Sequence, residues 1–296
     1  MVYIFICIDF DRDYAIPLQN HKHAISNVLK SESEEITNNP EFSASIKGTI
    51  ESFNPLMTYL NDFKIPTIFY YEARSLNLFN RLQKKQFKLL KRHYFEHGVH
   101  GYDHEDLSGE DTGVKFSKNE ETELLKNAKK EVEDLLSTEI YGFRAPYMKL
   151  SSNTIEILSK LGFKHDSSIY KSSERGIIPY RIDENITEFP VIKTPKESEM
   201  KGMYTYLWPL FEGKRSKEEV IQNYIHIYKN SVEKNSYVSI NLHSWHFAYN
   251  ISQNCYLSET KIQENIDTFT KLIKELEKEN VLISTPTLWL EENNQF

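Results

Sequence analysis

The chain begins with the stretch VYIFICIDFD at residues 2–11, an unbroken apolar run that ends in two aspartates. A run of β-branched, aromatic and aliphatic residues bounded by charge is typical of a strand that is buried on both faces. Asp9 and Asp11 are two positions apart where the strand becomes a loop, so their side chains would share a face. An acidic loop is ordinary by itself. Active sites of parallel α/β folds, however, collect at the carboxyl ends of strands.

Similar short apolar runs alternate with longer, helix-like stretches along the rest of the chain. The expected strands lie at residues 2–8, 66–71, 94–99, 140–144, 163–165, 187–192, 237–242 and 281–284. Helix-like stretches occupy residues 46–61, 81–92, 120–136, 153–161, 217–233 and 260–279. Repeated βα units predict a parallel sheet, and seven to eight such strands are enough to close a barrel.

Two stretches interrupt this alternation, near residues 13–45 and 193–216. Both are polar or irregular, and long excursions in an α/β domain are often loops that face the substrate. We predict one domain over residues 1–296 that carries these two insertions.

Composition narrows the functional classes. The chain has 36 basic and 43 acidic residues, a net charge of -7, and its lysines are spread along the expected helices. We therefore expect no nucleic-acid partner. Cys7 and Cys255 have no CxxC spacing and are interpreted as reduced thiols. The first residues lack the basic leader of a signal peptide, and no apolar run is long enough to span a membrane. These patterns favour a cytoplasmic protein.

The stretch HGVHGYDHED at residues 97–106 indicates a metal site. If His100 ends a strand and His104 follows one helical turn later, their Cβ atoms lie about 5–6 Å apart on one face. Two imidazoles at that separation can bind one ion. Two ligands alone make an incomplete site, so other residues must complete it.

Other polar residues follow the ends of three further strands. Arg144 stands in Arg-Ala-Pro-Tyr, Asp166 in Asp-Ser-Ser, and His243 in Leu-His-Ser-Trp-His. A buried arginine at a strand end usually needs a carboxylate partner, and Asp9 is the candidate.

These five elements, taken in order, resemble the polysaccharide deacetylase family, also called the NodB homology or carbohydrate esterase 4 group. The resemblance runs from the first strand to the last. It implies a distorted (β/α)7-type barrel with mostly parallel strands, which agrees with the strand count above. It also implies that Asp9 is a general base and that Asp11, His100 and His104 are the metal ligands.

The remaining roles follow from the same resemblance. Arg144 would orient Asp9, the backbone N–H of Tyr147 would donate to the oxyanion, and His243 would be the general acid. Asp166 matches the fourth and most variable family motif by its place in the chain and its residue type. We expect it near His243, where its charge would favour the imidazolium form of that ring.

Such a set of residues suits hydrolysis. One aspartate and two histidines leave open positions for water and substrate, and Zn²⁺ is the first choice, with Co²⁺, Ni²⁺, Fe²⁺ or Mn²⁺ as other candidates. Three nearby aromatic residues have less certain roles. His97 points to the opposite face from His100 and is expected to be structural, whereas His246 could line the pocket. Trp245 could stack on a sugar ring or cover the metal site.

The sequence therefore predicts a metal-dependent hydrolase that removes an N-acyl group, acetyl first, from an amino sugar, with an intracellular glycan precursor as the expected substrate. A homo-oligomer is possible. Two alternatives remain open. One is an allantoinase-like or deformylase-type hydrolase of another carbon–nitrogen bond, and the other is a glycan-binding barrel without turnover.

Overall fold

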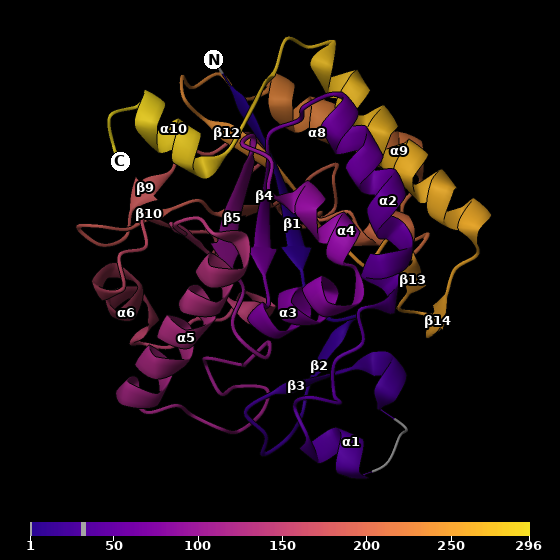
Figure 1. The fold of residues 1–296 in the computed structure, drawn as a ribbon. Coiled ribbons are helices and arrows are strands. Elements are labelled where there is room, and N and C mark those ends of the chain that lie inside the picture. The colour runs from indigo at the N-terminus through magenta and orange to yellow at the C-terminus, as the bar shows by residue number, and fades with distance from the viewer. Residues whose placement is uncertain (1, 31–33) are drawn as a thin grey trace.

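Strand β1 (Tyr3–Phe10) lies inside the main sheet, as its apolar run predicts, and all eight of its residues are buried. The computed structural model describes residues 2–30 and 34–296. On one side β1 pairs with β12 (Tyr237–His243), and on the other it pairs first with β15 (Leu282–Ser284) and then with β4 (Thr67–Tyr71). In Figure 1 these strands occupy the middle of the molecule, surrounded by helices.

The main sheet has the order β12-β1-β4-β5-β6-β7-β10-β9. Its neighbouring strands are parallel except for the antiparallel pair β10 and β9. The further members are β5 (Phe95–Val99), β6 (Gly142–Phe143), β7 (His165–Asp166), β9 (Tyr180–Arg181) and β10 (Thr187–Glu188). Short pairs lie outside it: β2 (Ala15–Pro17) with β3 (Ala24–Ser26), β8 (Tyr170–Ser172) with β11 (Val191–Lys193), and β13 (Tyr249–Asn250) with β14 (Cys255–Tyr256).

Helices cover the outside of this sheet (Figure 1). The α-helices are α1 (Glu34–Asn38), α2 (Lys47–Asp62), α3 (Ala73–Leu82), α4 (Lys84–Phe87), α5 (Lys118–Leu136), α6 (Thr154–Lys160), α7 (Trp208–Phe211), α8 (Lys217–Lys229), α9 (Glu259–Glu277) and α10 (Pro286–Glu292). Three short 3-10 helices are η1 (Asn27–Leu29), η2 (Lys88–Leu90) and η3 (Pro146–Met148). Helix α9 packs against both α2 and α8, and α5 packs against α3 and α6. This is the expected distorted barrel of mostly parallel strands.

The second insertion closes the barrel. The strand β12 forms a parallel bridge from Asn241 to Tyr206, and Tyr204 bridges in turn to Lys193 at the end of β11. The backbone N–H of Thr205 also donates to the carbonyl of Ile192. Closure is therefore made by an irregular segment and not by a regular strand. The stretch that interrupts the sequence pattern thus supplies part of the barrel wall.

Several expected elements differ from those observed. The helix expected over residues 81–92 is divided, because α3 ends at Leu82 and the chain continues as the short α4 and η2. The strand expected at residues 140–144 contributes only two paired residues, in β6, and the strand expected at 163–165 contributes only His165 to β7. The first insertion forms the hairpin of β2 and β3, which lies near the ends of β1 and β4 in Figure 1.

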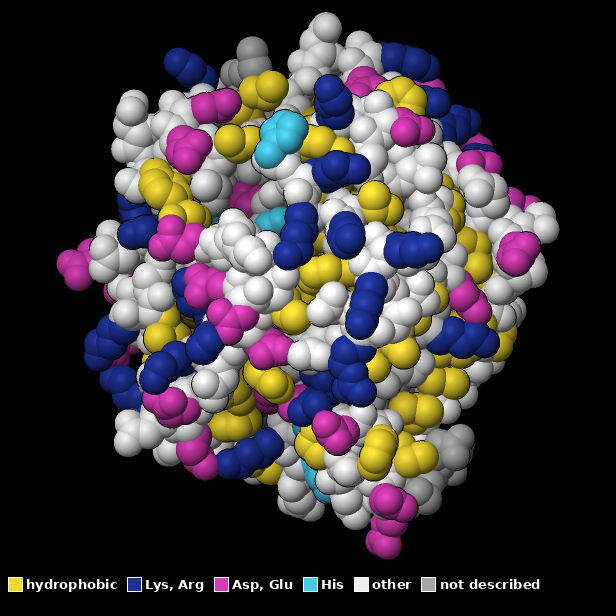
Figure 2. All heavy atoms as spheres, viewed as in Figure 1, with side chains coloured by type: hydrophobic (Ala, Val, Ile, Leu, Met, Phe, Trp, Pro, Cys, Tyr) yellow, Lys and Arg dark blue, Asp and Glu magenta, His cyan; other side chains and the backbone are white. Residues whose placement is uncertain are grey.

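The surface carries both signs of charge interspersed with apolar side chains, as Figure 2 shows for one face. Within residues 2–30 and 34–296, no helix combines the length and apolar character that crossing a membrane requires.

Candidate active site

A cavity of about 400 Å³ opens at the carboxyl ends of the barrel strands. Six of the eight residues expected in the site line its wall: Asp9, Asp11, His100, His104, Tyr147 and His243. The other two, Arg144 and Asp166, are fully buried behind it. The parallel register explains much of this convergence, because Asp9 at the end of β1 lies directly opposite His243 at the end of β12.

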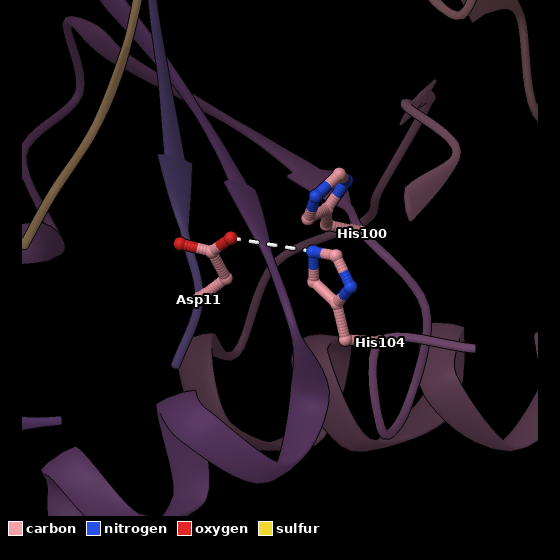
Figure 3. Close-up of side chains that lie close together, drawn as sticks. All are labelled: Asp11, His100 and His104. Carbon is pink, nitrogen blue, oxygen red and sulfur yellow. Dashed lines mark ion pairs between the residues drawn. The ribbon is translucent and has the colours of Figure 1, made fainter. Parts of the chain in front are cut away.

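Asp11, His100 and His104 form the floor of a candidate metal site (Figure 3). One carboxylate oxygen and one nitrogen from each ring lie within 4.8 Å of one another, and all three residues are buried. The Nε2 atom of His104 is 3.3 Å from Asp11. No other group of three or more histidine, cysteine, aspartate or glutamate side chains in the described ranges has a comparable arrangement.

The donor set fits a divalent metal ion. The Nδ1 atom of His100 lies 2.8 Å from the carbonyl oxygen of Arg144, so Nδ1 carries the proton and Nε2 keeps its lone pair for a ligand. Burial lowers the pKa of His100 to about 4, which leaves its ring neutral near pH 7. One carboxylate and two imidazoles are ligands that Zn²⁺ and related ions take in hydrolytic sites.

The loop that carries the two histidines is not a helical turn, contrary to the spacing argument. His100 follows β5, and the chain then passes through Gly101 with φ +77 and His104 with φ 56. The Glu105 carboxylate accepts hydrogen bonds from the backbone N–H groups of Tyr102 and Asp103 at 2.9 and 2.8 Å. This tight loop places the two imidazole centroids 4.9 Å apart and nearly perpendicular.

Arg12 joins the two loops that carry the ligands. It is fully buried, and its Nε donates to the Glu72 carboxylate at 2.9 Å. Its guanidinium also lies 3.4 Å from Asp103, the neighbour of His104. Since Arg12 directly follows Asp11 in the chain, this network fixes both ligand loops to each other without any contribution from a metal ion.

Asp9 is held by two donors. Arg144 donates to its Oδ1 at 2.8 Å, and both side chains are buried. The hydroxyl group of Tyr206, in the second insertion, donates to its Oδ2 at 3.0 Å. The pairing with Arg144 was expected from the sequence, whereas the contact with Tyr206 was not.

His243 contacts Asp11 across the cavity floor, with Nδ1 at 3.1 Å from Oδ2. Burial would lower the pKa of His243, but the Asp11 carboxylate raises it above the ordinary value. Burial would likewise raise the pKa of Asp11, but the adjacent His243 and His104 rings hold it well below its usual range.

The expected contact between Asp166 and His243 is not seen among the described residues. Its carboxyl group lies beside Ser168 and Glu188, whereas His243 contacts Asp11 and the rings of Tyr206 and Trp245. In the short β7, Asp166 pairs in register with Glu188 of β10, and it does not line the cavity. Asp166 therefore does not orient His243.

The buried Asp166–Glu188 pair predicts a pH effect on stability. Burial and the neighbouring Asp166 raise the pKa of Glu188 well above 4.5, so the folded chain keeps a proton that the unfolded chain releases above that pH. This stability is full at acid pH and is lost as the pH rises. Glu188→Gln should therefore unfold at a higher urea concentration than the unmodified protein at pH 8, and the difference should shrink toward pH 4. The exposed Glu184→Gln is the control, and a difference independent of pH would contradict the assignment.

Trp245 and His246 have clearer roles in the structure than in the sequence. The indole N–H of Trp245 donates to Asp11 at 2.7 Å, and its ring stacks against both His243 and His246. Trp245 is only 1% exposed, which leaves little of its ring for a sugar. His246 lines the cavity and contacts Glu212 of the second insertion. His97 instead contacts Tyr71, away from the cavity wall.

Trp245→Phe should weaken metal binding by about 10- to 100-fold, because residues that orient a ligand contribute at this level. The phenyl ring preserves stacking but cannot donate to Asp11. Competition with a chelator measures the affinity. Trp289→Phe is the matched control, since that buried indole donates to the carbonyl of Asn235, far from the cavity. Equal affinities in the two variants would contradict this role.

Comparison with known proteins identifies a related protein family. The family model for polysaccharide deacetylase matches residues 47–165. This stretch of the chain resembles the polysaccharide deacetylase family. The family match includes His100, His104, Arg144 and Tyr147, whereas Asp9 and the other residues of β1 and β12 lie outside it.

Individual relatives agree with this resemblance. The peptidoglycan deacetylase of Helicobacter pylori is 30% identical over 114 residues, which are 38% of this chain and 36% of that protein, so the match spans about a third of this relative. The structure of a Mycobacterium smegmatis protein described as a polysaccharide deacetylase is 17% identical, with a TM-score of 0.63 over 98% of this chain and 90% of that one. Puue allantoinase is 14% identical, with a TM-score of 0.65 over 100% and 92%. At these identities the two structures establish the fold alone.

Proposed function

We propose that this chain is a metal-dependent hydrolase of the polysaccharide deacetylase family that removes the N-acetyl group of an amino sugar. The observation that carries the proposal is the convergence of Asp11, His100 and His104 at one end of a cavity, with Asp9 and His243 beside them. Asp11, His100 and His104 would hold a divalent ion, with zinc as first choice, which supplies Lewis-acid polarisation and lowers the pKa of bound water.

The chain's own residues would divide the proton transfers. Asp9, held by Arg144, accepts the proton of the attacking water. His243, whose pKa is raised beside Asp11, donates a proton to the departing amine. The two groups are favoured in opposite protonation states, as an acid and base pair requires.

The backbone at Tyr147 would stabilise the oxyanion. Tyr147 has φ 57 and the following Met148 has φ 56, two consecutive residues in the left-handed region. Non-glycine residues there store strain, which is common at functional sites. Tyr147 lines the cavity and its ring packs edge-on against His104 at 4.6 Å, which supports this residue as the oxyanion donor.

The natural substrate is proposed to be a glycan or its precursor, and an intracellular precursor is favoured only if the chain acts in the cytoplasm. Cell fractionation with an antibody against the chain tests the location. If the chain were recovered in the secreted or envelope fraction, the proposed substrate would instead be a finished polymer.

A product assay tests the reaction. The purified chain, loaded separately with Zn²⁺, Co²⁺ and Mn²⁺, is incubated with N-acetylglucosamine oligomers, N-formylated sugars and allantoin. Acetate release from the oligomers is the expected result. Formate or a ring-opened product alone would favour the other carbon–nitrogen hydrolases, and sugar binding without any product would favour the non-catalytic barrel.

A further inference from the structure

We propose that Tyr206, from the second insertion, is a positioning residue that holds Asp9 in place relative to His243. This inference rests on the proposed function for the role of those two residues. Tyr206 lies outside residues 47–165, the range matched by the family model, and no motif marks it in the sequence.

The hydroxyl group of Tyr206 completes the support of Asp9. It donates to Oδ2 of Asp9 at 3.0 Å, while Arg144 donates to the other carboxylate oxygen, Oδ1, at 2.8 Å. Each carboxylate oxygen has two lone pairs, so one lone pair on each atom remains for water. Two donors on different oxygens fix the plane of the carboxylate, which a single donor cannot do.

The ring of Tyr206 contacts the other member of the pair. Its centroid is 5.9 Å from that of His243, with an interplanar angle of 26°. One side chain therefore contacts both groups that transfer protons, through its hydroxyl group on Asp9 and through its ring on His243. The spacing of the acid and the base depends in part on where Tyr206 lies.

The backbone on both sides of Tyr206 is anchored to β12. The N–H of Asn241 donates to the carbonyl of Thr205, and the N–H of Leu207 donates to the carbonyl of Asn241, both at 2.9 Å. The Asn241 side chain also accepts from Arg144 at 2.8 Å. Tyr206 is 8% exposed, so its position is set by the sheet and not by a free loop.

The test is Tyr206→Phe, which keeps the ring and removes only the hydroxyl group. We expect kcat to fall about 10- to 100-fold, the range for one hydrogen bond to a charged group, with KM and metal content unchanged. Tyr237→Phe is the matched control. The buried hydroxyl group of Tyr237 donates to the Pro190 carbonyl. The variant therefore loses a buried tyrosine hydrogen bond without affecting Asp9.

Two results would overturn the inference. One is a wild-type kcat in Tyr206→Phe, or a drop no larger than that of Tyr237→Phe at matched thermal stability. The other is a raised KM at unchanged kcat, which would place the hydroxyl group on the substrate instead. Crystal structures of the unmodified protein and Tyr206→Phe give a readout independent of turnover. The Asp9 carboxylate should rotate about its remaining bond to Arg144, and an unmoved carboxylate would also reject the proposal. Absence of acetate release from the unmodified protein would instead reject the proposed function.

Discussion

Asp9→Asn should lower turnover by about 10²- to 10⁴-fold, the range that general-base catalysis contributes, because an amide cannot accept the proton of the attacking water. The substitution is nearly isosteric, and the amide oxygen can still accept from Arg144, which lies 2.8 Å from Oδ1. Asp9 is not one of the three converging ligand residues. Acetate release measures turnover, and elemental analysis of the same preparation measures metal content. The metal content should remain near that of the unmodified protein.

The control is Asp134→Asn, which neutralises a surface carboxylate of α5 that is 63% exposed. It should keep full turnover. If Asp9→Asn lost the metal together with activity, Asp9 would be a ligand, and the assignment of base and ligand within the acidic pair would have to be exchanged.

His104→Ala should abolish both activity and stable metal binding. It removes one of the three proposed protein ligands, so the loss of affinity should exceed about 100-fold, the upper end for residues that merely orient a ligand. Elemental analysis after dialysis measures the bound ion, and thermal unfolding with and without added zinc measures the linked loss of stabilisation.

The matched control is His97→Ala. His97 lies in the same stretch on β5, but its Nδ1 contacts the Tyr71 hydroxyl at 3.1 Å and it does not line the cavity. This variant should keep its metal. Metal retained by His104→Ala, or lost from His97→Ala, would show that the ion is bound elsewhere.

Much of the fold, and the residues of the candidate metal site that lie together in it, could be predicted from the sequence because both depend on local signals. The apolar run of β1 marks a buried strand, and a parallel sheet places residues such as Asp11 and His100 at the same edge. The family resemblance assigned a role to each of these motifs. Their three-dimensional convergence needs only that the strands pair in parallel, which the βα alternation indicates.

The rest depended on contacts between segments far apart in the chain. Tyr206 lies in an irregular stretch whose position is set by bonds to Asn241, and no periodicity marks such a segment. The indole of Trp245 could have faced a sugar, and only the folded chain brings its N–H to Asp11. The pairing of Asp166 with Glu188 likewise depends on β10, which the local sequence around Asp166 does not reveal.

The buried Arg12 network has a consequence for the choice of cation. Its bonds to Glu72 and Asp103 hold the two ligand loops together independently of any ion. We therefore expect the empty protein to stay folded and to exchange one transition metal for another without rebuilding its scaffold. Occupancy of the proposed site would then follow cellular supply and the intrinsic order of affinities, so the proposed hydrolase activity would respond to changes in the surrounding metal pool.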